Sequence, residues 1–286
     1  MVDLGAMIRR NVPPEDVVGL ARDLAPLVDE LWLVEDLGWA GGIAQVAAVL
    51  AATADVRVGH GVAPAPFRNA AALAMEWGAL ARAHPGRLHA GLGHGVPEWM
   101  DQVGSSPRSR LTLLREVATA TRRLLAGETV TVAGDHVQLA DVGLVFPPSR
   151  VPPVSLGVSG PRSLRLSGEV ADGTVLAEGT GPTELRAART AIDAGRAMAG
   201  VTAPHRLTVF VASWCGDPAA APPAPEAVGE DWTATGATPA EVAGRLRDLV
   251  DAGADALVLV PFGDRVADQV DQVALAAQEV LPLVRS

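Results

Sequence analysis

The chain has 286 residues, 49% of them apolar, and a formal net charge of -10. This length suits one large α/β barrel or two smaller domains, and it allows a sizeable core. The acidic balance and a pI near 5.0 argue against nucleic acid as a partner, because nucleic-acid binding needs a basic face. No apolar stretch reaches the roughly 18 residues of a membrane helix, so we expect no membrane partner either.

The residue types that are absent exclude whole reaction classes. The chain contains no lysine and no tyrosine. Schiff-base aldolase chemistry and a Walker-type phosphate loop both need a lysine amine and are excluded. An aldo-keto reductase, which pairs tyrosine with lysine, is excluded as well. The single cysteine, Cys215, allows no internal disulfide, and the N-terminus lacks the basic segment of a secretory signal. Both features predict a cytoplasmic protein.

In chain order, apolar runs alternate with segments of helical spacing. Strands are expected at Val2–Ile8, Leu31–Val34, Val56–Val58, Arg87–Leu92, Val154–Val158, Gly173–Ala177, Leu207–Ala212 and Ala256–Val260. One helix is expected after each strand; two of them begin at Pro13 and Thr238, and the others cover Gly41–Ala54, Asn69–Ala83, Leu111–Leu125, Pro161–Val170, Thr183–Ala199 and Arg265–Val284. Strands that alternate with helices favour a parallel sheet. Eight such units predict an α/β fold, a closed (β/α)₈ TIM barrel that forms a single domain over residues 1–286.

Two segments interrupt this alternation. The first, residues 127–153, follows the fourth helix and is expected to be an insertion. Within it, Thr129–Phe146 alternates loosely around a Gly134-Asp135 turn, which is typical of a short hairpin. The second, residues 215–237, is rich in proline and alanine and is expected to form a lid or a surface loop.

The tetrapeptide Gly-His-Gly-Val occurs twice, at Gly59–Val62 and at Gly93–Val96. Each copy follows an expected strand, and the two copies lie one β/α unit apart. The carboxyl ends of barrel strands are where catalytic and cofactor-binding groups lie. Glycine on both sides of the histidine lets a planar ligand approach the backbone, so the repeat predicts a ligand site at this rim.

Titratable side chains gather at the expected ends of the second, third and fourth strands. The candidates for proton transfer are Glu35, Asp36, His60, His94 and Glu98. Histidine and carboxylate are also zinc ligands, so a metal-dependent TIM-barrel hydrolase is an alternative from another class. Metal barrels usually take a ligand from the first strand, where Leu4–Met7 offers none. We therefore predict no resident metal.

A glycine-rich turn follows the fifth expected strand, at Gly157–Gly160, and Pro161 then starts a helix. Free backbone N–H groups and the positive end of a helix bind phosphate at such a turn. Ser159 and Ser163 add hydroxyl donors, and either Arg162 or Arg165 is expected to add charge. The segment predicts a phosphate site.

Together these segments resemble the bacterial luciferase-like flavin-dependent oxidoreductases, in particular their F420-dependent branch. The resemblance rests on Val56–Val62 with Pro64 and Arg68–Ala70, on Pro85–Gly95, and on Gly157–Gly173. In the last segment a Gly-x-x-Gly-Pro turn leads into a helix, and Ala-Asp-Gly opens the next strand.

The resemblance implies that F420, or alternatively FMN, lies across the C-terminal rim, with a non-prolyl cis peptide near Gly61-Val62 behind its ring. Its contacts would come from Gly59, Gly61, Val62, Gly93, Gly95, Gly157, Val158, Ser159, Gly160 and Arg162. The implied activity is hydride transfer between F420 and an organic substrate, and the alternative is a reduced-FMN monooxygenase. The implied partners are a small-molecule substrate, a second copy in a homodimer, and a separate flavin or F420 reductase. The chain departs from the pattern where Asp36-Leu37 replaces the histidine that F420-dependent members often carry, and arginine must replace lysine against the anionic tail of F420.

Overall fold

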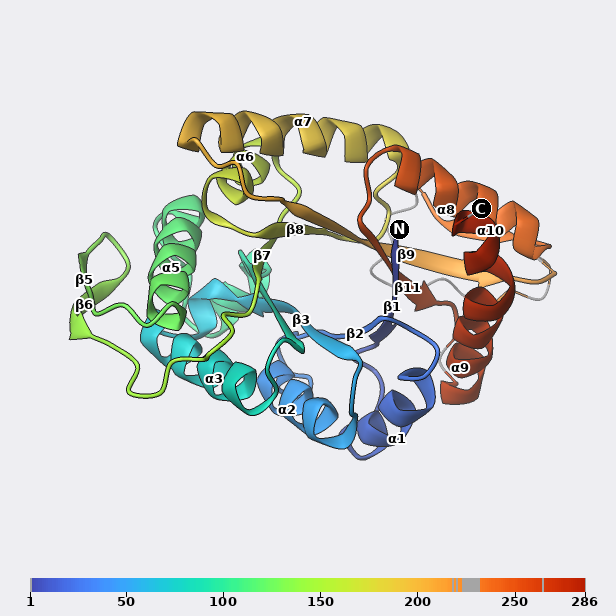
Figure 1. Ribbon diagram of the computed structural model, residues 1–286, viewed down its shortest axis with the longest axis horizontal. Coiled ribbons are helices and arrows are strands. Elements are labelled where there is room, and N and C mark those ends of the chain that lie inside the picture. Colours follow the sequence, from blue (N-terminus) through green and yellow to red (C-terminus); the bar gives the residue numbers. More distant parts are fainter. Residues whose placement is uncertain (1, 218, 220, 223–231, 264, 286) are drawn as a thin grey trace.

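The computed structural model describes residues 2–217, 219, 221–222, 232–263 and 265–285. Eight parallel strands close into a barrel, because β9 pairs with β8 on one side and with β11 on the other (Figure 1). In ring order the strands are β1 (Asp3–Ile8), β2 (Glu30–Leu33), β3 (Arg57–Pro64), β4 (Leu88–Gly93), β7 (Val154–Gly157), β8 (Gly173–Leu176), β9 (Arg206–Cys215) and β11 (Ala256–Pro261). The predicted (β/α)₈ barrel is confirmed.

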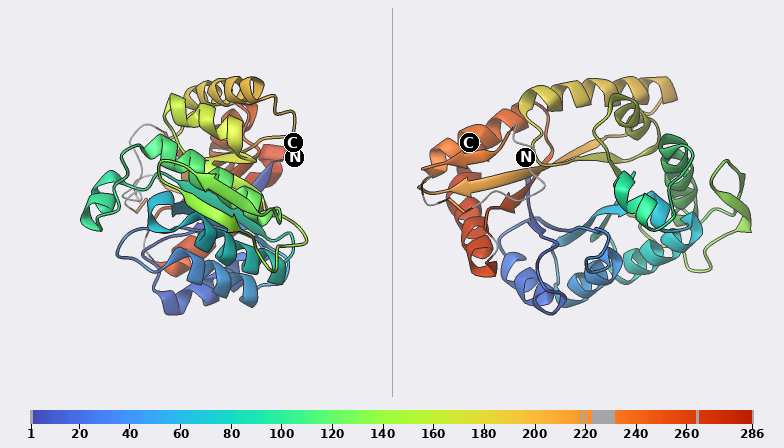
Figure 2. Two further views of the ribbon diagram at one scale, coloured as in Figure 1. Left: turned by 90° about the vertical axis from the view of Figure 1, so that its left-hand side faces the viewer. Right: turned by 180° about the vertical axis from the view of Figure 1, so that it is seen from behind.

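Helices cover the outside of this barrel (Figures 1 and 2). In chain order they are α1 (Pro14–Leu24), α2 (Gly42–Ala52), α3 (Ala70–Ala83), α4 (Pro97–Gln102), α5 (Arg110–Leu125), α6 (Pro161–Val170), α7 (Pro182–Ala199), α8 (Pro239–Asp251), α9 (Val266–Leu275) and α10 (Leu281–Arg285). A short 3₁₀ turn, η1 (Ala65–Phe67), precedes α3, and a π-helical turn, η3 (Ala276–Val280), links α9 to α10. The starts follow the sequence signals: proline opens α1, α4, α6, α7 and α8, and the side chains of Asn69, Ser109 and Thr238 cap α3, α5 and α8.

The inserted hairpin is present where the alternation predicted it. β5 (Val130–Ala133) and β6 (Gln138–Val142) pair antiparallel across the Gly134-Asp135 turn, and the hairpin projects beyond α5 at the edge of the molecule (Figure 1). Glu116 of α5 holds the turn, because its carboxylate accepts hydrogen bonds from three consecutive backbone N–H groups, those of residues 135–137.

Three elements differ from the prediction. β3 runs on to Pro64, so the first Gly-His-Gly-Val lies within a strand, whereas it was expected to follow one. The rim segment after β4 contains the short helix α4. Within the predicted lid or surface loop at 215–237, β10 (Ala234–Gly236) pairs parallel with the end of β9, beyond the point where β8 ends. The remainder of that prediction, at residues 218, 220 and 223–231, lies outside the described residues.

The apolar core has two parts. The larger part lies between the strands and the helices. The smaller part fills the middle of the barrel and consists of Met7, Trp32, Val175, Phe210, Val258 and Val260, with Val34 and Val62 packed on it. The Trp32 indole is its largest member, is fully buried, and lies edge-on to Phe210 at 5.5 Å between ring centroids. An apolar floor therefore lies beneath the C-terminal mouth of the barrel.

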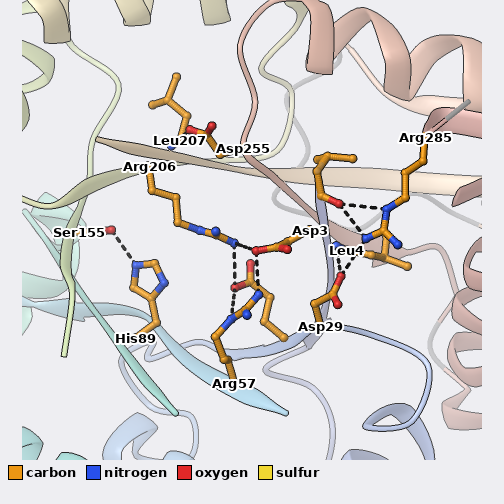
Figure 3. Close-up of polar contacts among 12 residues, drawn as sticks. Asp3, Leu4, Asp29, Arg57, His89, Ser155, Arg206, Leu207, Asp255 and Arg285 are labelled. Carbon is orange, nitrogen blue, oxygen red and sulfur yellow. Dashed lines mark hydrogen bonds and ion pairs between the residues drawn. The ribbon is translucent and has the colours of Figure 1, made fainter. Parts of the chain in front are cut away.

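Charged side chains fill the opposite, N-terminal end of the barrel (Figure 3). Asp3 Oδ2 lies 2.7 Å from a guanidinium nitrogen of Arg57 and 2.7 Å from one of Arg206. Glu30, only 1% exposed, pairs with both arginines at 3.7 and 3.2 Å. His89 lies beside this group, and burial, followed by the charges of the two arginines, lowers its pKa to about 3. We call these five residues the barrel plug.

The two ends of the described chain lie close together in both views (Figures 1 and 2). Arg285 of α10 donates two hydrogen bonds to the carbonyl oxygen of Val2 and lies 3.1 Å from Asp29. Of the helices that the structure describes, none has the length and apolar content needed to cross a membrane.

Candidate active site

A cavity of about 730 Å³ opens at the carboxyl ends of β2, β3, β4 and β7. Its outer wall comes from Trp99 of α4 and from the first turns of α5 and α6. This is the rim at which the sequence predicted a site. Most predicted site residues line it, namely Glu35, Asp36, Gly61, Val62, Gly93, His94, Gly95, Gly157, Val158, Ser159, Gly160 and Arg162. Three predicted residues, Gly59, His60 and Glu98, do not belong to this lining.

The glycines of β3 make room for a side chain of the protein itself. A Cβ atom on Gly59 would lie 2.2 Å from the Trp32 indole, and one on Gly61 would lie 2.6 Å from it. These contacts are too short for any side chain, so glycine is required at both positions. The interpretation of the repeat as a place where a planar ligand approaches the backbone is wrong at Gly59, because the Trp32 indole occupies the space.

The peptide bond between Gly61 and Val62 is cis, as the resemblance predicted, and the register of β3 against β4 shifts between His60 and Ala63. The Val62 side chain lies over the neighbouring strands. A Cβ atom on Gly93 or Gly157 would lie 2.6 or 2.9 Å from its methyl groups. The three residues thus form a close-packed surface at the cavity wall, with the apolar floor beneath it.

His60 lies on the other side of the barrel wall. Its ring is fully buried, Nδ1 accepts a hydrogen bond of 3.3 Å from Trp77 Nε1 of α3, and Nε2 lies 3.4 Å from Glu35 Oε2. Arg68 binds both oxygens of the same carboxylate at 2.7 and 2.6 Å, and the N–H of Gly42 donates to it at 3.3 Å. Glu35 is therefore held from three sides at the cavity wall.

The environment of Glu35 keeps it ionised. Burial raises its pKa, but the contacts with His60 and Arg68 and their charges outweigh burial and lower the pKa to about 2. A carboxylate with this pKa has no proton to donate near neutral pH. The geometry favours a positioning role for Glu35 and His60, which fix the end of β2 against α2 and α3. The buried His60 ring and the exposed Glu98 of α4 do not line the cavity. Their role in proton transfer stays a prediction.

His94 faces the cavity at the end of β4. Its Nε2 lies 2.8 Å from Ser163 Oγ at the start of α6. Burial, followed by the nearby charge of Arg110, holds the pKa of His94 below its ordinary value, so the imidazole is neutral at pH 7. The contact links the end of β4 to α6. Of the two predicted histidines, only His94 lines the cavity.

The turn that the sequence predicts to bind phosphate lines the cavity. Gly160 begins α6 with φ of -74°, and a Cβ added to it would meet nothing within 4 Å. Arg162 follows in the first turn. Across the cavity, Arg110 occupies the first turn of α5 next to its cap, Ser109. Neither arginine forms an ion pair within the part of the chain that the structure describes. The cavity lining therefore offers two helix N-termini and two available cations.

Two charged residues at the rim were missed by sequence reasoning. Arg110 is the first residue of α5, and a cation in the first turn of a helix that follows a rim segment is a usable signal. Glu178 lies two positions beyond the last residue of β8, and an acidic residue directly after a strand was a usable signal there. Burial, and next the charge of Asp36, raise the pKa of Glu178.

No group of three or more His, Cys, Asp or Glu side chains that could hold a metal ion occurs among the described residues. The ligand set that a metal-dependent hydrolase would need is therefore not assembled in this part of the chain. His60 and His94, the proposed ligands of that alternative, lie on opposite sides of the barrel wall.

Comparison with known proteins agrees with this geometry. A family model described as luciferase-like monooxygenase matches residues 2–221. The chain belongs to this family.

Individual relatives are similar to this chain over part or all of its length. Over 172 residues the chain is 33% identical to a 5,10-methylenetetrahydromethanopterin reductase of Methanolobus tindarius; the match covers 60% of this chain and 52% of that enzyme, so the chain spans about half of its length. It is 29% identical over 275 residues to an F420-dependent glucose-6-phosphate dehydrogenase of Intrasporangium calvum, with 82% and 81% of the two chains covered. An F420-dependent secondary alcohol dehydrogenase, solved with an F420–acetone adduct, superposes with a TM-score of 0.85 at 19% identity over 100% of both chains.

Proposed function

We propose that the protein is an F420-dependent oxidoreductase that transfers a hydride between the deazaflavin and an organic substrate. The observation that carries this proposal is the cavity, whose lining combines the Gly61–Val62 surface with the N-termini of α5 and α6 and their arginines, Arg110 and Arg162. F420 has the matching parts, a planar ring and a phosphate followed by a carboxylate-bearing tail. The names of the relatives support the same cofactor.

The residues present fit this group. The backbone N–H groups at Ser159 and Gly160 would bind the phosphate, because the space beside Gly160 is open. Arg162 and Arg110 would pair with the anionic tail, and Val62 would support the ring. When bound, the deazaflavin supplies the hydride, and the protein supplies position and electrostatics.

The cofactor preference is tested by fluorescence titration with F420 and FMN at low and high salt. F420 should bind more tightly than FMN, and its affinity should fall as salt rises, because exposed charge pairs are screened. Arg162→Ala and Arg110→Ala should each weaken F420 binding about tenfold, since hydrogen bonds between charged groups contribute about 1.5 to 3 kcal/mol. Arg165→Ala is the matched control, because Arg165 is exposed on the same helix α6 but lies outside the cavity lining. Tighter binding of FMN without salt dependence would favour the alternative, a reduced-FMN monooxygenase.

The phosphate position is tested at Gly160. We expect Gly160→Val to weaken F420 binding at least tenfold while the urea midpoint changes little, because the Cβ meets no protein atom and would project toward the bound phosphate. Gly104→Val serves as a contrast, since it is also free of neighbours but has φ of +66°, so it should cost stability and not affinity. An unchanged titration of the Gly160 variant would remove the phosphate from this turn.

A further inference from the structure

A second cavity, of about 490 Å³, opens at the amino ends of β7 and β8. Its lining comes from the end of α5 and the turn after it, from residues 150–153 directly before β7, and from Asp172 directly before β8. None of these residues lines the active-site cavity, which lies at the carboxyl ends of the strands. The second cavity is therefore separate from the site of the proposed reaction.

Both carboxylates in the lining of this second cavity are already paired. Asp172 accepts hydrogen bonds from Nε and Nη2 of Arg122, and its Oδ2 also accepts one of 2.9 Å from the N–H of Val154. Glu128 Oε2 accepts a hydrogen bond of 2.7 Å from Arg123 Nε. The two arginines lie in the last turn of α5, where cations also offset the negative end of the helix dipole. The charges of these four residues therefore balance one another.

Arg150 is the cation of the lining that remains. It is exposed, and it forms no ion pair or hydrogen bond within the part of the chain that the structure describes. Its guanidinium packs on the turn at Gly86, where an added Cβ atom would lie 2.6 Å from Nη1 of Arg150. The terminal nitrogens of Arg123 likewise have no hydrogen-bond partner among the described residues. The cavity therefore offers guanidinium donors from two arginines and one uncompensated positive charge.

The rest of the lining is apolar and rigid. It consists of Ala126, Val151, Pro152 and Pro153, and the Val151 side chain is 46% exposed. Consecutive prolines have a fixed φ and no backbone N–H, so this strip is preformed and offers a ligand an apolar surface. A mostly apolar wall beside a few polar groups is the usual composition of a small-molecule site.

We propose that this second cavity binds a small organic anion, a compound that carries a phosphate or carboxylate group on an apolar body. The anionic group pairs with Arg150 and with the terminal nitrogens of Arg123, because guanidinium groups bind both kinds of oxyanion through parallel N–H donors. The apolar body lies on Val151 and the two prolines. This proposal does not depend on the proposed function.

The site is tested with two-dimensional ¹H–¹⁵N NMR spectra during titration with phenyl phosphate, benzoate, inorganic phosphate and phenol. The amide signals of Ala126, Glu128 and Val151 should shift and saturate with phenyl phosphate or benzoate, and the tighter of these two probes shows which anionic group the site prefers. Inorganic phosphate and phenol each lack one half of the ligand and should bind at least about tenfold more weakly. The amide signals of Ser159 and Gly160 report binding in the active-site cavity separately.

Variants of one residue test the role of the charge. Arg150→Ala should weaken binding of the tighter probe about tenfold, and rising salt should weaken binding to the wild type. Arg150→Lys keeps the charge but loses the planar set of donors, so its affinity should lie between those of the wild type and Arg150→Ala. Arg247→Ala is the matched control, because it removes an exposed arginine of α8 outside the lining; it should bind like the wild type.

Saturable shifts at residues 126, 128 and 151 that Arg150→Ala weakens would support the proposal. No saturable shift there with either phenyl phosphate or benzoate would overturn it, and so would equal affinities of Arg150→Ala and the wild type. Phenol that binds as tightly as phenyl phosphate would also overturn it, since the charge would then contribute nothing. Shifts confined to Ser159 and Gly160 would instead assign the anion to the active-site cavity and refute a second site.

Discussion

Glu35 shows how the partners of a residue decide what it does. The carboxylate is 7% exposed and is bound by Arg68, His60 and the Gly42 N–H. Its pKa falls from 4.5 in the unfolded chain to about 2 in the folded protein. A lowered carboxyl pKa contributes stability that is present above pH 4.5 and is lost as the pH falls toward 2.

We therefore expect Glu35→Gln to lower the free energy of unfolding by about 3 kcal/mol at pH 7. The difference from the wild type should shrink between pH 4.5 and 2. Urea unfolding at a series of pH values measures it, and Glu98→Gln, an exposed carboxylate on α4, should change stability by less than about 0.5 kcal/mol. A difference that is constant with pH would show that the ion pairs do not cause it.

For single residues, the sequence predicts which residues belong to the site better than it predicts which way their side chains face. The Gly157–Gly160 turn and Arg162 line the cavity as expected, because a glycine turn before a proline-started helix is a local pattern. Whether His60 faces the cavity or the helices depends on the alternation within β3 and on where that strand ends. Two successive glycine-framed histidines looked equivalent, yet His60 packs on Trp77 while His94 faces the cavity.

The β5–β6 hairpin is an element whose attachment depends on one side chain. The Glu116 carboxylate accepts hydrogen bonds of 2.9, 2.8 and 2.8 Å from the N–H groups of residues 135–137. These backbone bonds outweigh burial and lower the pKa of Glu116. A Cβ on Gly134 would lie 2.5 Å from the same carboxylate, so the turn closes tightly on it.

Glu116→Ala should increase amide hydrogen exchange at residues 135–137 by about tenfold, because those N–H groups lose their acceptor. Exchange in β5 and β6 should change less, since Val130, Val137 and Leu139 remain buried. Cofactor affinity should be unchanged, because the hairpin does not line the cavity. Glu128→Ala, which removes an exposed carboxylate paired with Arg123 near the same hairpin, is the control. Unchanged exchange in Glu116→Ala would show that other contacts hold the turn.

At the scale of helices and strands, local sequence signals predict the helix starts and the hairpin. The extension of β3 and the formation of β10 depend on long-range contacts. β3 extends to Pro64 because it pairs with β4 on both sides of the bulge, and no property of Gly59–Val62 alone shows that pairing. β10 forms because β9 outlasts β8 and leaves an unpaired edge at Ser213–Cys215. The predicted homodimer depends on contacts between chains and stays a prediction.

For the whole molecule, the two ends of the barrel differ in structure. The C-terminal mouth is open and carries the cavity, while the plug closes the N-terminal end with Asp3, Glu30, Arg57, His89 and Arg206 (Figure 3). The four charges lie on the first residues of separate strands, so their ion pairs join β1, β2, β3 and β9. Removing one partner of a buried ion pair leaves an uncompensated charge. The stability of the barrel therefore depends on the charge states of the residues in the plug.

His89 gives this closure a pH dependence. Its ring is 4% exposed, its Nε2 lies 2.8 Å from Ser155 Oγ, and its pKa falls from 6.5 to about 3 on folding. The unfolded chain therefore binds a proton that the folded protein rejects. Stability is fully present above pH 6.5 and is lost as the pH falls toward 3.

Between pH 7 and 4.5 the wild type should lose roughly 2 to 3 kcal/mol of unfolding free energy through His89 alone. His89→Gln should remove that loss, because glutamine retains a polar atom for Ser155 and does not titrate. His205, whose pKa burial lowers to about 4, adds a parallel loss, so His205→Gln and the double variant separate the two contributions. Urea unfolding in this range measures both and avoids the lower window in which Glu35 titrates. If His89→Gln kept the slope of the wild type, the ring would be protonated within the fold, and the plug would have to accommodate a third positive charge beside Arg57 and Arg206.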